Sequence, residues 1–132
     1  MKRVFADTFY FLALLNRRDE AHSAALDCLT HIESLVTTEW VLLELADGLA
    51  SSKRREAFMQ TRQELMEDSN AVVVPLAMDL HLEAIRLYAN RSDKGWSLTD
   101  CVSFLVMQRE GITEALTGDQ HFEQAGFVAL LK

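Results

Sequence analysis

The segment Thr99–Phe122, TDCVSFLVMQREGITEALTGDQHF, contains the clearest structural pattern in this chain. Apolar residues recur at helical spacing over 102–109, and Gly111 is typical of a helix end. Residues 112–116 are few enough to form a strand. The segment therefore predicts a helix, a turn and a strand, in that order.

An aspartate lies near each end of this segment. Asp119 follows the predicted strand after Gly118, so we expect it at the carboxyl edge of a sheet, where open α/β sheets place their sites. Asp100 lies at the start of the predicted helix. A helix that packs antiparallel to parallel strands begins where those strands end, so Asp100 can reach the same edge. The two carboxylates are expected to meet.

The rest of the chain continues the alternation of strands and helices. Predicted strands cover 3–6 in the centre of the sheet, 34–38, 71–74 as the clearest buried strand, and 127–131 at an edge. Predicted helices cover 8–16, 19–31, 39–49, 53–68, 79–90 and 97–109. This alternation indicates an α/β fold with a mainly parallel sheet of four to five strands, covered on both faces.

Length and composition are those of one globular domain. The 132 residues predict a single domain over 1–132, and the 49% apolar and 25% charged residues are ordinary values. The longest uncharged run, Ser69–Met78, is much shorter than the roughly 18 residues of a membrane span. We expect no membrane association and no signal peptide, hence a cytoplasmic protein. Cys28 and Cys101 are isolated and are expected to be reduced, buried thiols.

The formal charge of −7 argues against a domain that holds nucleic acid by overall positive charge. It does not exclude a nuclease, because a cation bound by converging acids removes much of the local negative charge. Basic residues are concentrated in Arg17–Arg18 and in Lys53–Arg54–Arg55. These are candidate RNA contacts, with solvated helix ends and loops as the simpler interpretation.

The acids also have a structural interpretation. Asp7, Asp100 and Asp119 each lie where a predicted helix begins, so each can act as a helix cap. Ser97 and Asp100 in particular have the spacing of a capping box. Glu44 lies in the middle of a predicted helix and caps nothing, but a solvated position is an equal alternative.

Taken together, the acids favour a metal site. Several carboxylates at one sheet edge would repel each other without a cation between them. Carboxylates without a cluster of Cys or His suit Mg²⁺, which can orient a water for attack on a phosphodiester. The four histidines show no zinc spacing, and we expect His121 to be a packing or helix-start residue rather than a general base. Trp40 and Trp96 are expected to pack in the core or at an interface.

Six segments form a wider pattern, in chain order: VFADT (4–8), ALLNRRD (13–19), TTEWVLLE (37–44), SLTDCVSF (97–104), LTGDQHF (116–122) and QAGF (124–127). With these segments the sequence resembles PIN-domain proteins of the VapC toxin type. The resemblance covers nearly the whole chain. It implies a three-layer α/β/α sandwich, an acidic Mg²⁺ or Mn²⁺ site and endoribonuclease activity directed at single strands.

The resemblance also assigns residues and partners. It places Asp7, Glu44, Asp100 and Asp119 at the acidic positions, with hydroxyl support from Thr117 and from Thr8. It further implies a homodimer and a small antitoxin whose tail fills the acidic groove. The apolar residues Phe9, Phe11, Leu12 and Leu15 are candidates for an interface.

Two positions depart from the family pattern. Phe9 stands where many members have Ser or Asn, so a polar contact near the metal is expected to be missing. Gly118 stands where a larger residue is common. Both departures leave the four acids in place, and they bear on the level of activity more than on its type.

The sequence favours a metal-dependent endoribonuclease that hydrolyses RNA with a metal-activated water, as the toxin of a toxin–antitoxin pair. The alternative is a non-catalytic module with the same fold that binds RNA or protein. Phosphoryl transfer through an aspartyl phosphate is a third class. The residues oppose this class, because no second acid follows Asp7 two residues later.

Overall fold

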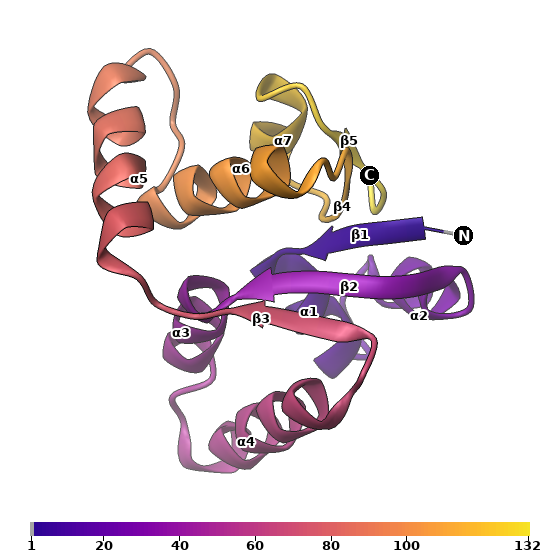
Figure 1. The fold of residues 1–132 in the computed structure, drawn as a ribbon. Helices are drawn as coiled ribbons and strands as arrows, with labels where there is room; N and C mark the ends of the chain where they lie inside the picture. The colour runs from indigo at the N-terminus through magenta and orange to yellow at the C-terminus, as the bar shows by residue number, and fades with distance from the viewer. Residues whose placement is uncertain (1) are drawn as a thin grey trace.

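The structure, a computed structural model, describes residues 2–132 apart from the side chain of Ser52. Its centre is a five-stranded sheet with the order β3-β2-β1-β4-β5, in which every pair of neighbouring strands is parallel (Figure 1). The strands are β1 (Lys2–Ala6), β2 (Ile32–Thr38), β3 (Ala71–Val74), β4 (Glu114–Leu116) and β5 (Val128–Ala129). The parallel sheet and the central place of β1 are therefore confirmed.

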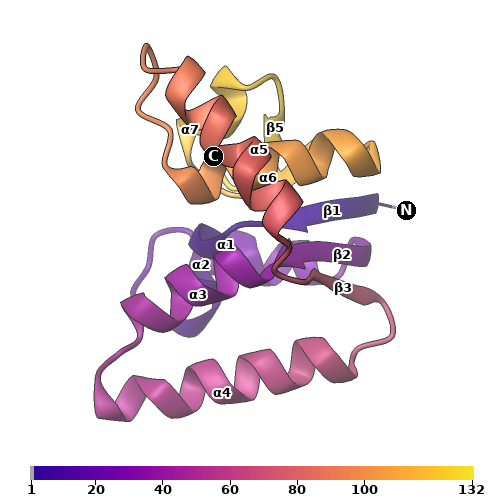
Figure 2. The ribbon, with the colours of Figure 1, turned by 60° about the vertical axis from the view of Figure 1, so that its left-hand side comes forward.

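Helices cover both faces of the sheet. They are α1 (Thr8–Leu15), α2 (His22–Leu29), α3 (Glu39–Gly48), α4 (Ser52–Glu67), α5 (Met78–Asn90), α6 (Leu98–Glu110) and α7 (Gln120–Gln124). Figures 1 and 2 show α1 to α4 on one side of the sheet and α5 to α7 on the other. The architecture is thus the three-layer α/β/α sandwich that the resemblance implies.

Local signals set the ends of α6 as the sequence predicts. Ser97 and Asp100 form a complete capping box at its start, in which each side chain accepts from the other residue's backbone N–H. Gly111 ends the helix with a φ of 66°, a left-handed conformation that glycine adopts without steric cost. The capping box fixes where Asp100 leaves the helix, and so where its side chain can point.

The core lies on both faces of the central strands. Val4, Phe5 and Ala6 of β1 are fully buried, and the rings of Phe104 and Phe122 pack edge to face at 5.0 Å above the sheet. Trp96 is buried beside Phe104, and Trp40 is buried beside His81, as expected for packing residues. This packing places the carboxyl end of β1 beneath α6 and α7.

Two expectations about the elements are wrong. The strand 71–74 is not the most buried one, because β3 is an edge strand with a single neighbour, and Val72 is 47% exposed. The helix expected from Asp19 begins only at His22, because Asp19 instead forms a turn in which its side chain accepts from the N–H of Ala21. A run of apolar β-branched residues does not distinguish an edge strand from a central one.

Within residues 2–132, no helix is both long enough and apolar enough to cross a membrane. Both cysteines are free thiols, with Cys101 buried and Cys28 half-buried. Burial raises the pKa of the Cys101 thiol to about 11, so it packs as a neutral side chain. The reduced state expected from their isolated positions agrees with this arrangement.

Candidate active site

Asp7 follows the last residue of β1 and lies at the carboxyl edge of the sheet. Its side chain makes no capping hydrogen bond with α1, so capping does not explain it. Its Oδ2 instead accepts a 2.9 Å hydrogen bond from Oγ1 of Thr117, and the residue is only 6% exposed. Burial is the main cause that raises the pKa of Asp7 to about 7, and the charges of Asp100 and Glu44 act in the same direction.

Glu44 reaches the same edge from α3. Thr8 Oγ1 donates to Glu44 Oε1 at 2.5 Å, and Thr8 is the residue directly after Asp7. The negative charge of Glu44 contributes to the raised pKa of Asp7, which places the two carboxylates within electrostatic range of each other. Glu44 is exposed, and its carboxylate is held by Thr8.

Asp100 has two roles. It closes the capping box of α6, so the structural interpretation is correct, yet its Oδ2 also lies 3.0 Å from Nδ1 of His121. Burial raises its pKa, and the charge of Asp119 adds to this effect, whereas the bonds from Ser97 and His121 oppose it. Capping therefore holds Asp100 in place without removing it from the acid group.

Asp119 is the N-cap of α7, with Oδ1 accepting from the N–H of His121 at 2.9 Å. Its own N–H donates to Oγ1 of Thr117 at 3.1 Å, so the hydroxyl of Thr117 joins Asp7 and Asp119. The four acids are thus connected through three intermediaries, Thr8, Thr117 and His121. The structure places all four at one edge of the sheet.

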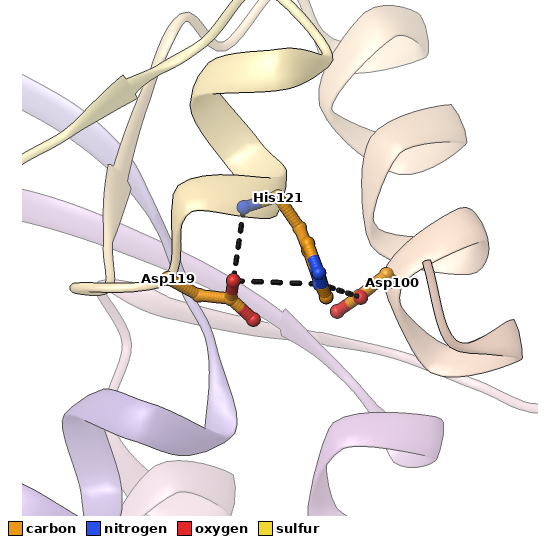
Figure 3. A group of neighbouring side chains, drawn as sticks. All are labelled: Asp100, Asp119 and His121. Atoms are coloured by element: carbon orange, nitrogen blue, oxygen red, sulfur yellow. Dashed lines mark hydrogen bonds and ion pairs between the residues drawn. The ribbon is translucent and has the colours of Figure 1, made fainter. Parts of the chain in front are cut away.

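His121 belongs to the site as well, although its sequence context does not indicate this. It lies at a helix start, as expected, but its ring points between two acids rather than into the core (Figure 3). Nδ1 is 3.0 Å from Asp100 Oδ2 and 3.4 Å from Asp119 Oδ1. The available signal was its position two residues after a capping aspartate, which places both side chains on one side of the first helical turn.

The donor set suits a divalent cation. One ligand atom each from Asp100, Asp119 and His121 lie within 4.8 Å of one another. Asp7 and Glu44 lie outside this group of three but are linked to it by Thr117 and by charge. Because burial and mutual repulsion disfavour the charged carboxylates, a cation among them removes an electrostatic cost that the residues alone do not offset.

The two departures from the family pattern are in contact with each other. A Cβ atom at Gly118 would lie 2.6 Å from Cζ of Phe9, with Cε1 and Cε2 at 3.0 and 3.1 Å. Gly118 does not have a positive φ, so its backbone would accept other residues. The ring of Phe9 therefore occupies the space that a side chain at position 118 would need. This position lies between Thr117 and Asp119 in the chain.

The basic RNA-contact candidates are not part of the acid group. Arg17 and Arg18 are exposed between α1 and α2, and Lys53, Arg54 and Arg55 are exposed in the first turn of α4. Arg55 donates to the backbone oxygen of Ala50. In the described part of the chain, no hydrogen bond or ion pair connects these cations to the four acids, and their contact with RNA stays a prediction.

An apolar groove lies away from the acids, between α1 and α4. Its volume is about 360 Å³ and its lining includes Tyr10, Phe11, Leu14, Leu15, Leu29 and Leu65. Tyr10 is 1% exposed, and its hydroxyl has no hydrogen-bond partner among the described residues. Of the predicted interface residues, Phe11 belongs to the core, whereas Leu15 is 42% exposed at the groove.

The fold and the acidic edge define the class of protein. The family model of the PIN domain matches residues 4–128, and the chain belongs to that family. The resemblance to PIN-domain proteins of the VapC type is confirmed.

Individual proteins that are similar to this chain support the same family assignment. The 23S rRNA-specific endonuclease VapC20 of Mycobacterium tuberculosis is 27% identical over 132 residues, with 95% of each chain covered. Its crystal structure, that of a sarcin-ricin loop cleaving toxin, matches with a TM-score of 0.85 and 26% identity over 95% of this chain and 96% of that one.

More distant structures share the fold. VapBC2 from Rickettsia felis, bound to a DNA fragment from its promoter, gives a TM-score of 0.65 at 15% identity, covering 97% of this chain and 96% of that one. FitAcB from Neisseria gonorrhoeae gives 0.63 at 16% identity, covering 96% and 94%.

Proposed function

We propose that this protein is a metal-dependent endoribonuclease of the VapC type, which hydrolyses phosphodiester bonds in RNA. The observation that carries the proposal is the connection of Asp7, Glu44, Asp100 and Asp119 through hydrogen bonds and charge at one sheet edge. The endonuclease activity of VapC20, which is similar over 95% of both chains, supports the same reaction.

The four acids bind Mg²⁺ or Mn²⁺ in this proposal, directly or through waters. A bound divalent ion supplies positive charge for the phosphate and orients a water for hydrolysis. Thr117 fixes the carboxylate of Asp7 and the backbone of Asp119, and Thr8 fixes Glu44. Because these hydroxyls are themselves buried, the carboxylates are held in position before substrate arrives.

The decisive experiment is RNA cleavage by purified protein with Mg²⁺, with Mn²⁺ and with EDTA. We expect cleavage that EDTA abolishes, and a loss of at least about a hundredfold in Asp7→Asn and in Asp119→Asn. Asp27→Asn, an exposed aspartate of α2, is the matched control and should cleave like wild type. Metal binding without cleavage of any RNA pool would instead favour the non-catalytic binding module.

A small antitoxin is the proposed partner, since the VapBC2 assembly is among the structures with this fold. The apolar groove between α1 and α4 supports this partner, because Leu15 and Leu29 there are 42% and 51% exposed. Co-purification with the product of a neighbouring short gene would test the pairing, and Leu15→Glu should weaken it.

A homodimer is the proposed assembly. Met78, Leu82 and Ile85 recur at helical spacing along α5 and are 68%, 46% and 39% exposed, with Leu76 just before them at 64%. An exposed apolar stripe of this kind favours contact with another protein surface. Sedimentation should give a dimer for wild type and a monomer for Leu82→Glu. The control is Leu43→Glu, which makes the same substitution at an exposed leucine of α3, outside the stripe on α5.

A further inference from the structure

We propose that His121 binds the divalent ion directly through Nδ1, so that the site selects first-row transition ions such as Mn²⁺ over Mg²⁺. This inference rests on the proposed function, since it concerns the same ion. It adds a nitrogen donor to a site for which the sequence indicates carboxylates only. It also names an ion preference, which the four acids alone leave open.

The first support is the placement of the ring. The backbone N–H of His121 bonds to Oδ1 of Asp119, which fixes the first turn of α7 against that carboxylate. From there the ring extends between α6 and α7, so that Nδ1 faces Asp100 and Asp119 together (Figure 3). Its other nitrogen, Nε2, faces the loop before α6, where a Cβ on Gly95 would lie 3.6 Å away. One end of the ring therefore faces the two carboxylates, and the other end lies near Gly95.

The second support is a comparison with the other histidines. Nδ1 of His22 lies 2.7 Å from the backbone oxygen of Ala13, and Nδ1 of His81 accepts from Trp40 Nε1 at 3.2 Å. Nδ1 of His31 contacts its own helix end at the backbone oxygen of Asp27. Each of these has an ordinary partner within the fold. Only His121, among the histidines of the described chain, directs Nδ1 at two carboxylates.

The third support is the chemistry of the donors. The hydrogen bonds to the side chain of Asp100 involve Oδ2, and those to the side chain of Asp119 involve Oδ1. No described residue makes a hydrogen bond to the other oxygen of either carboxylate. One ligand atom each from Asp100, Asp119 and His121 lies within 4.8 Å of the others, so an unprotonated Nδ1 and the two carboxylates form a mixed nitrogen and oxygen donor set. Mg²⁺ prefers oxygen ligands and water, whereas imidazole nitrogen strengthens the binding of transition ions.

The alternative role for His121 is to donate Nδ1–H to Asp100 and only orient it. The two roles differ in one measurable respect, which is whether a histidine nitrogen is bonded to the ion. Pulsed electron paramagnetic resonance of bound Mn²⁺ detects such a nitrogen without reference to activity. Incorporation of histidine labelled with heavy nitrogen identifies the signal as histidine in the unaltered protein, so the test does not depend on a variant that folds.

The experiment combines this spectrum with calorimetric titration of Mn²⁺ and Mg²⁺. We expect a histidine nitrogen signal in wild type, tighter binding of Mn²⁺ than of Mg²⁺, and loss of the signal in His121→Ala. Mn²⁺ affinity should fall at least about tenfold in His121→Ala, which is the size of effect that removal of a group at a metal site usually has. Mg²⁺ affinity should change by no more than about twofold, because its site is built from oxygen. His31→Ala is the matched control and should keep the signal and both affinities.

Two results would overturn the inference, and only one of them would also refute the proposed function. Mn²⁺ bound to wild type without a histidine nitrogen signal, but released by Asp119→Asn, would refute the ligand role and leave the proposed nuclease intact. Failure of wild type to bind either ion, or binding that survives both Asp100→Asn and Asp119→Asn, would refute the inference and the proposed function together.

Discussion

Oγ1 of Thr117 donates a 2.9 Å hydrogen bond to Oδ2 of Asp7, although 110 residues separate them in the chain. The contact follows from the sheet, because Ala6 and Leu116 are paired partners in β1 and β4, and the next residues leave the two strands side by side. Thr117 is fully buried. The end of one parallel pair of strands therefore positions an acid and the hydroxyl that holds it.

Replacement of Thr117 tests this relationship. Thr117→Val keeps the shape of the side chain but removes the donor to Asp7 and the acceptor for the N–H of Asp119, so we expect a loss of about 1–3 kcal/mol in the free energy of unfolding. RNA cleavage should fall as well. Thr117→Ser retains the hydroxyl and should recover most of both quantities. Equal urea denaturation midpoints for Val and Ser variants would show that the hydrogen bonds do not matter.

The raised pKa of Asp7 predicts how stability depends on pH. The folded protein holds this proton up to about pH 7, whereas the unfolded chain releases it near the ordinary aspartate pKa of 3.8. The folded state therefore binds more protons in this interval, and the free energy of unfolding should fall as pH rises from about 4 to about 7, by up to about 4 kcal/mol. Denaturant titrations in metal-free buffer across this range measure the slope.

Asp7→Asn supplies the control for that slope. It removes the titrating group but keeps an oxygen for Thr117, so the variant should be more stable than wild type near pH 8 without metal, and its pH dependence should be weaker. Added Mn²⁺ should stabilise wild type at that pH more than the variant. A wild-type slope of opposite sign, or one that Asp7→Asn leaves unchanged, would show that Asp7 is not the responsible group.

The contact between Phe9 and Gly118 predicts coupled substitutions. In Gly118→Ala the new Cβ meets the ring of Phe9, so the protein should lose about 1–3 kcal/mol of stability. In a Phe9→Ala background the space is open, and the same change should cost less than about 0.5 kcal/mol. The four unfolding free energies of this double-mutant cycle give the coupling. Additive effects would mean that the ring moves aside freely.

Much of the acid group could be predicted because it follows from topology. Asp7 comes directly after β1 and Asp119 follows shortly after β4, and parallel strands deliver such residues to one edge regardless of their distance in sequence. Asp100 was predictable for a local reason, since its capping box fixes the start of α6. Gly111 likewise ended that helix as its sequence signal indicates.

Other features depend on tertiary contacts that no local pattern encodes. The ring of His121 faces two acids because α6 and α7 pack side by side. Its position in the sequence indicates closeness to Asp119 but not to Asp100. Phe9 and Gly118 depart from the family pattern in separate segments of the sequence, and only the fold shows that they are in contact. The exposure of Val72 depends on the strand order, which places β3 at an edge.

The most direct test of the central claim is a crystal of the protein soaked in Mn²⁺, with the ion located from its anomalous scattering. We expect a peak at the carboxyl edge of the sheet, in contact with Asp100 and Asp119 and close to Asp7, that is absent from crystals of Asp119→Asn. A peak elsewhere on the protein, or an unchanged peak in that variant, would contradict that claim.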